Sequence, residues 1–95
     1  MAASSERIRE VVEAYVALVG SGSADQVVAL YADGATVEDP VGSEVLTTRE
    51  QIHAFYATLE GLEQETRLLE ARICGGQAAF CFEVRTKAEG ATYVL

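Results

Sequence analysis

The chain has 95 residues, of which 49% are hydrophobic and 23% are charged, and its formal net charge at pH 7 is −8. A chain of this length supplies one hydrophobic core, so we predict a single domain over residues 1–95. The excess of acidic side chains disfavours phosphate-rich surfaces, and we expect neither nucleic acid nor a membrane as a partner. No apolar run approaches the ~20 residues that a membrane-spanning helix needs.

The N-terminal residues and the cysteines indicate the compartment. Residues 1–6 carry neither the basic segment nor the apolar segment of a secretory signal, so we expect a cytoplasmic protein. Cys74 and Cys81 would stay reduced there, and we expect two buried or half-buried free thiols. Because the cysteines lack metal-ligand spacing and the chain has one histidine, we expect no metal site and no cofactor.

Two helices are predicted at the start of the chain. Residues 5–19 form the first, because apolar side chains recur with helical spacing on one face: Ile8, Val11, Val12, Tyr15, Val16 and Val19. Ser23 and Gln26 have the spacing of a capping box, which begins a short second helix that ends at Tyr31. Asp33-Gly34 then stops this helix.

A short strand and a third helix are predicted next. Residues 35–40 alternate and are β-branched, so they are expected to form a strand that Pro40 ends or places at an edge. Either Thr47 with Glu50 or Thr48 with Gln51 can then form a capping box. The helix that follows presents one apolar stripe, formed by Ile52, Phe55, Tyr56 and Leu59.

The second half of the chain has the two-residue period of antiparallel strands. Leu69, Ala71 and Ile73 alternate with charged residues, and Gly75-Gly76 supplies a hairpin turn. In residues 77–87 the apolar face is formed by the even positions: Ala78, Phe80, Phe82, Val84 and Thr86. Helices followed by strands predict an α+β fold with the helices across one face of a bent sheet.

Residues 91–95 begin a further strand whose edge is apolar. Natural proteins cover, charge or shorten such an edge because it promotes aggregation. We therefore expect further strands to pair with it, supplied either by a longer gene product or by a second chain.

Polar residues within apolar patterns are the candidates for chemistry. Asp39 precedes Pro40, whose ring restricts Asp39 to extended conformations, although the same dipeptide is also common in turns. Tyr15, Tyr31 and Tyr56 are predicted to point inward, either as ordinary core residues or as a connected network of hydroxyl groups.

The only histidine, His53, lies off the apolar stripe and is expected to be exposed. A Ser-His or Cys-His nucleophile pair is therefore not predicted. A carboxylate and phenols in an apolar cavity suit proton abstraction next to a carbonyl, since the carboxylate takes the proton and a hydroxyl group stabilises the enolate oxygen.

Three segments, residues 15–19, 30–42 and 49–56, closely resemble bacterial Δ5-3-ketosteroid isomerases. The most specific is the run from Tyr31 to Pro40, Tyr-Ala-Asp-Gly-Ala-Thr-Val-Glu-Asp-Pro. That family has the cone-shaped α+β fold of nuclear transport factor 2, scytalone dehydratase and limonene epoxide hydrolase. The resemblance implies N-terminal helices packed on a curved, mainly antiparallel sheet, and a homodimer.

The resemblance also implies a role for each matching residue. Asp39 would be the general base that moves a proton from C4 to C6 of a 3-oxo-Δ5-steroid or a similar apolar molecule. Tyr15 would donate a hydrogen bond to the developing oxyanion, and Tyr31 and Tyr56 would support it through hydrogen bonds. The positions that match the substrate pocket are Val19, Phe55, Phe82, Val84 and Leu95.

The family's second oxyanion donor, an aspartate, would fall a few positions beyond Leu95. We therefore expect this chain to be incomplete at its C-terminus, to lack the last strands, and to need a complementary C-terminal segment for full activity. An alternative is a module of the same fold that binds an apolar ligand or dimerises without turnover. A polyketide cyclase or an epoxide hydrolase is less favoured, because the Asp-Arg-Asp cluster of the hydrolase needs an inward arginine that the helices do not predict.

Overall fold

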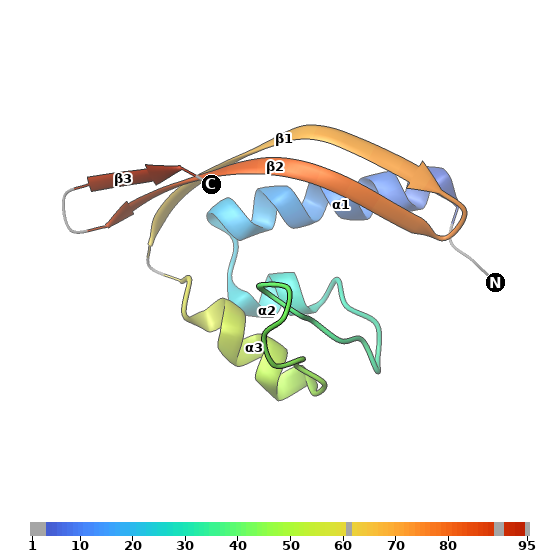
Figure 1. Cartoon of the computed structure of the whole chain (residues 1–95), viewed down its shortest axis with the longest axis horizontal. Coiled ribbons are helices and arrows are strands. Elements are labelled where there is room, and N and C mark those ends of the chain that lie inside the picture. The colour runs from blue at the N-terminus through green and yellow to red at the C-terminus, as the bar shows by residue number, and fades with distance from the viewer. Residues whose placement is uncertain (1–3, 61, 89–90, 95) are drawn as a thin grey trace. The chain divides into compact units, whose positions relative to one another are not determined.

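The computed structural model describes residues 4–60, 62–88 and 91–94 (Figure 1). The chain divides into two compact units. The helix–sheet unit comprises Met1–Ser21 and Leu62–Leu95, and the helix-pair unit comprises Gly22–Gly61. The elements in chain order are α1 (Ser5–Ser21), α2 (Ala24–Val28), α3 (Arg49–Ala57), β1 (Glu63–Cys74), β2 (Gln77–Ala88) and β3 (Ala91–Val94).

In the helix–sheet unit, α1 lies along one face of a three-stranded antiparallel sheet with the order β1-β2-β3 (Figure 1). The predicted apolar stripe of α1 is confirmed, because Val12 and Val16 are only 5% and 4% exposed. Thr66 of β1 donates a 2.5 Å hydrogen bond from its hydroxyl group to the carbonyl of Val16. A Cβ atom at Gly20 would lie 2.6 Å from Thr66 Oγ1, so the glycine permits this close approach of helix and strand.

The β1–β2 hairpin turns at Gly75, where φ is +58° and a glycine is favoured. The hairpin predicted at Gly75-Gly76 is confirmed. One prediction for β1 is wrong: Leu69 does not share a face with Ala71 and Ile73, and its side chain is 55% exposed. A register shift between Leu68 and Glu70 is the cause, because the extra residue of a bulge reverses the alternation of faces.

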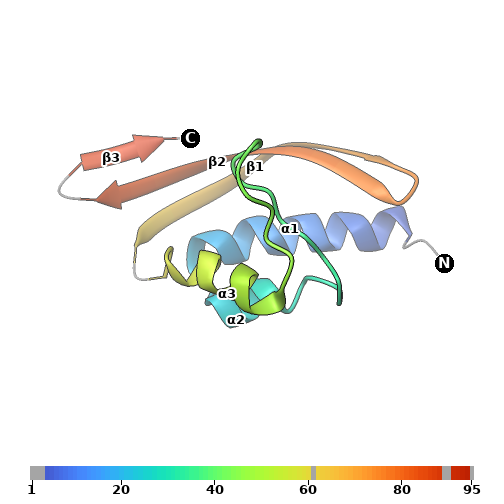
Figure 2. The same ribbon diagram turned by 60° about the horizontal axis from the view of Figure 1, so that its bottom comes forward.

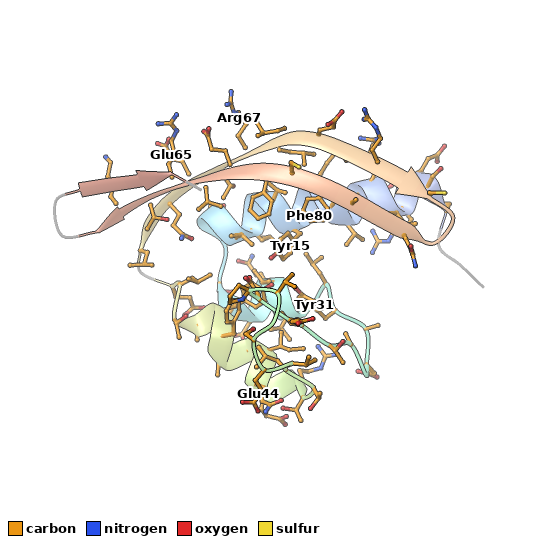
Figure 3. The ribbon with its side chains drawn as sticks, viewed as in Figure 1. Tyr15, Tyr31, Glu44, Glu65, Arg67 and Phe80 are labelled. Carbon is orange, nitrogen blue, oxygen red and sulfur yellow. The ribbon has the colours of Figure 1, made fainter. Side chains whose placement is uncertain are left out.

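The predicted alternation of the two faces of β2 is confirmed in part, because Ala78 at the hairpin end is exposed and Glu83 is half-buried. Phe80, Phe82 and Val84 are half-buried, whereas Cys81 and Arg85 are exposed. Figure 3 shows Phe80 on the side of the sheet that carries α1, and Glu65 and Arg67 projecting from the opposite side.

The expectation of buried or half-buried thiols is wrong, since Cys74 and Cys81 are both free and exposed. Cys81 lies within an apolar run, but the alternation of the strand points its side chain to the face opposite Phe80 and Phe82. Cys74 is the last residue of β1, beside the exposed turn. Position along the strand therefore determines the exposure of both thiols more than local hydropathy does.

In the helix-pair unit, α2 and α3 pack against each other (Figure 2). The buried residues of these two helices are Ala24, Val27, Val28, Ile52 and Tyr56. The capping box of Ser23 with Gln26 is confirmed. Helix α2 is shorter than predicted, because it ends at Val28 and Tyr31 lies beyond it.

Thr48 with Gln51, rather than Thr47 with Glu50, forms the capping box of α3. Thr48 Oγ1 accepts from the backbone N–H of Gln51 at 3.1 Å, and the Gln51 side chain accepts from the Thr48 N–H at 3.1 Å.

We expect Thr48→Ala to lower the free energy of unfolding by about 1 kcal/mol. Thr47→Ala is the matched control and should cost less than half as much in the same urea titration, because the Thr47 hydroxyl accepts from no backbone amide of the described residues. Equal losses from the two variants would contradict the assignment.

The prediction of a strand over residues 35–40 is wrong. Among the residues that the structure describes, the segment forms one isolated antiparallel bridge, between Val37 and Leu46, with hydrogen bonds of 3.0 Å and 2.7 Å. Pro40 has no N–H to continue the ladder, and the chain reverses direction between Pro40 and Ser43, where Gly42 has a φ of +93°. Residues 35–40 therefore form a single β-bridge followed by a loop, although their side chains alternate as in a strand.

Candidate functional site

Asp39 lies in the loop of residues 38–45, which we call the Asp39 loop. The Val37–Leu46 bridge closes the base of this loop. At its tip the carbonyl of Pro40 accepts from the N–H of Ser43 at 3.0 Å and from the hydroxyl group of Ser43 at 2.6 Å. Asp39 therefore lies on a segment whose backbone is held at both ends.

The carboxylate of Asp39 is exposed, and it makes no hydrogen bond or ion pair with residues 4–60, 62–88 or 91–94. Its neighbour Glu38 differs, because Glu38 Oε2 accepts from the N–H of Gly42 at 2.7 Å. Within the described chain the lone pairs of Asp39 are thus not engaged in holding the loop together. A carboxylate in this state can accept a proton from a ligand.

Tyr31 and Tyr56 form a pair of phenols in the helix-pair unit. Their hydroxyl oxygens are 2.7 Å apart, which is a short hydrogen bond, and either can be the donor. Tyr56 of α3 is 5% exposed, and Phe55 packs edge-to-face against it with ring centroids 5.0 Å apart. The structure therefore brings three of the predicted site residues together.

Arg49, the first residue of α3, holds the end of α2. Its guanidinium donates to the carbonyls of Val28 at 3.1 Å and Tyr31 at 3.2 Å, and to Asp33 Oδ1 at 2.9 Å. Sequence reasoning missed this role and placed no arginine toward the interior of the helices. The available signal was that α2 has no basic residue in its last turn, so that its terminal carbonyls need another donor.

Arg49 does not create the Asp-Arg-Asp cluster of an epoxide hydrolase. Asp33 is its one carboxylate partner among the described residues. The nearby Asp25 instead pairs with His53, with Oδ1 and Nε2 2.8 Å apart. His53 was predicted to be exposed, and its side chain is 45% exposed on the surface of the helix-pair unit.

Tyr15 lies in the helix–sheet unit, half-buried on α1. Its ring packs edge-to-face against Phe80 and Phe82, with centroid distances of 6.0 Å to each, and Figure 3 shows Tyr15 and Phe80 on the same side of the sheet. The two phenylalanine rings stack with centroids 5.8 Å apart. We call these three residues the aromatic cluster. Sequence reasoning identified Tyr15 and Phe82, but it placed Phe80 only on the apolar face of its strand.

The remaining predicted pocket residues divide between the two units. Val19 and Val84 are half-buried in the helix–sheet unit, and Phe55 is half-buried in the helix-pair unit. Leu95 lies outside the described residues. Tyr15 belongs to the helix–sheet unit and Asp39 to the helix-pair unit.

Residues 4–60, 62–88 and 91–94 contain no group of three or more His, Cys, Asp or Glu side chains that could hold a metal ion. In the same part of the chain, no helix combines the length and the apolar character that crossing a membrane requires.

The helices and the antiparallel sheet define a protein of the nuclear transport factor 2-like α+β class, which confirms the predicted fold class. Residues 12–95 match the SnoaL-like domain, and the chain belongs to this family. A Steroid Delta-isomerase from Nocardioides simplex is 41% identical to it over 91 residues, which are 96% of this chain and 74% of that protein. The resemblance to ketosteroid isomerases is confirmed.

Two solved structures share the fold at low sequence identity. One is the epoxide hydrolase/cyclase-like enzyme SalBIII, described for pyran ring formation in the polyether salinomycin, with a TM-score of 0.75 and 22% identity over 87% of this chain. The other is an M. tuberculosis LEH-like epoxide hydrolase, with a TM-score of 0.73 and 15% identity over 90% of this chain. This chain spans 66% and 64% of their lengths.

Proposed function

We propose that the protein is a steroid Δ-isomerase that moves a C=C bond from Δ5 to Δ4 in 3-oxosteroids. The observation that carries this proposal is the 41% identity to a Steroid Delta-isomerase over 96% of the chain. The unengaged carboxylate of Asp39 supports it, because the reaction needs a base with free lone pairs.

Asp39 acts as the proton shuttle in the proposed mechanism. Its carboxylate removes a proton from C4, and the electrons of the broken C–H bond form a dienolate whose charge lies on the C3 oxygen. The protonated Asp39 then returns the same proton to C6, which moves the double bond into conjugation with the ketone. The substrate and the product are isomers, so no oxidant, reductant or cofactor is consumed.

Tyr15 donates the hydrogen bond that stabilises the dienolate oxygen in this proposal. Packing against Phe80 and Phe82 restricts the orientation of its ring before the charge develops. A donor that is already oriented in apolar surroundings stabilises the transition state without reorganising. We assign a supporting role to Tyr31 and Tyr56, since a hydrogen bond between two phenols polarises the one that donates onward.

The substrate is a 3-oxo-Δ5-steroid or a similar apolar molecule, and the proposed pocket residues are Val19, Phe55, Phe82, Val84 and Leu95. We also propose a cytoplasmic homodimer in which residues 1–95 belong to a single isomerase domain. Full activity in this proposal needs a segment that continues the sheet beyond β3, supplied by the same polypeptide or by another.

The test is isomerisation of 5-androstene-3,17-dione, followed by the ultraviolet absorbance of the conjugated product. We expect a slow rate for the 95-residue chain and a faster one after addition of a peptide that contains the corresponding C-terminal strands of the Nocardioides simplex relative. Tight binding of equilenin with no isomerisation, with or without the peptide, would instead favour a non-catalytic module that binds apolar ligands.

A further inference from the structure

We propose that Glu38 is a positioning residue for Asp39, and that it acts by holding the backbone amide of Gly42 across the Asp39 loop. Glu38 Oε2 accepts from the Gly42 N–H at 2.7 Å. A bond from an amide to an ionised carboxylate is charge-assisted and stronger than one between neutral groups. This inference rests on the proposed function, because it requires Asp39 to be the base.

The loop is held in three places, and Asp39 lies between two of them. The Val37–Leu46 bridge fixes the base, and the bonds between Pro40 and Ser43 fix the tip. The bond from Glu38 to Gly42 connects the residue before Asp39 to the far side of the turn. The backbone on both sides of Asp39 is therefore restrained, while its own carboxylate stays unengaged among the described residues.

Gly42 is suited to this contact. Its φ of +93° lies in the region that favours glycine. A Cβ atom there would have no neighbour within 4 Å, so glycine is favoured by the backbone conformation and not by a lack of space for a side chain. Because Glu38 holds the loop backbone through this bond, whereas Asp39 makes no hydrogen bond or ion pair among the described residues, we assign Glu38 to positioning and Asp39 to proton transfer.

Glu44 is an acidic residue of the same loop that makes no contact like the hydrogen bond between Glu38 and Gly42. Glu44, labelled in Figure 3, is exposed and makes no hydrogen bond or ion pair with residues 4–60, 62–88 or 91–94. Glu44→Ala therefore removes a carboxylate from the same loop without removing a loop contact, which makes it the matched control.

We expect Glu38→Ala to lower kcat about 10- to 100-fold with little change in KM, because a small displacement of the reacting group is enough to cause such a loss. Glu38→Gln should retain most of the activity, since its amide oxygen can accept the same bond. Glu44→Ala should match the unmodified chain. All rates are measured in the presence of the C-terminal peptide, and the melting temperature of each variant is recorded.

Hydrogen exchange at the Gly42 amide, followed by NMR, gives a readout that does not depend on activity. We expect faster exchange in Glu38→Ala and unchanged exchange in Glu38→Gln and Glu44→Ala. Unchanged exchange in Glu38→Ala would overturn the inference, as would equal losses of kcat in Glu38→Ala and Glu38→Gln, which would indicate an effect of charge.

Asp39→Asn in the same series separates the inference from the function on which it rests. If Asp39→Asn is inactive and Glu38→Ala is fully active, Asp39 remains the base and only the positioning role of Glu38 is overturned. If Asp39→Asn is as active as the unmodified chain, or the unmodified chain shows no isomerisation, the proposed function fails and the role of Glu38 fails with it.

Discussion

Asp39→Asn should lower kcat for the isomerisation of 5-androstene-3,17-dione by about 10²- to 10⁴-fold, the range that a positioned general base contributes. The amide has nearly the shape of the carboxylate but cannot accept the C4 proton at neutral pH. Because the Asp39 side chain is exposed and makes no hydrogen bond or ion pair among the described residues, the substitution should leave the melting temperature unchanged. The loss would then report chemistry and not folding.

Asp33→Asn is the control for Asp39→Asn, since it removes the same charge from another aspartate of the helix-pair unit. Asp33 accepts from Arg49 in an exposed ion pair, and such pairs contribute about 0–1 kcal/mol to stability. We expect this control to keep its rate. If both variants lost activity equally, net charge would explain the effect, and if neither did, another group would have to be the base.

Local chemistry specified the helices well. The apolar stripe of α1 and the capping box of Ser23 with Gln26 depend on residues three or four positions apart, so the sequence contains all the information they need. For α3 the sequence offered two overlapping capping boxes, and only the structure distinguishes Thr48 from Thr47. Which hydroxyl group reaches the third amide depends on the path by which the chain enters the helix.

The errors in the strands come from single residues that change the pattern. The bulge near Leu69 moves an apolar side chain to the exposed face, and no local signal marks it because both neighbours of Leu69 are compatible with a strand. In residues 35–40 a β-branched pattern predicted a ladder, but hydrogen bonds across the turn at Pro40 replace it. Pairing depends on partners distant in the sequence, which composition cannot identify.

The site could be predicted in part. Matching residues proposed Asp39 and the three tyrosines as site residues, and the hydrogen bond between Tyr31 and Tyr56 is consistent with the predicted network. The contact of Arg49 with the end of α2 could not be found by periodicity, because it joins residues 18 and 21 positions apart. Glu38 was likewise not recognised, since only the reversal of the chain brings Gly42 to its carboxylate.

Tyr15→Phe should lower kcat about 10²- to 10³-fold, the loss typical of removing one oxyanion donor. The substitution removes a hydroxyl group and keeps the ring that packs against Phe80 and Phe82, so the aromatic cluster should remain intact. Phe80→Leu is the complementary control, because it alters the packing around Tyr15 and keeps the hydroxyl group. Steady-state kinetics of both variants with the C-terminal peptide should show a much larger loss for Tyr15→Phe. A larger loss for Phe80→Leu would mean that the cluster matters as a hydrophobic wall, and that the negative charge of the dienolate is stabilised by another donor.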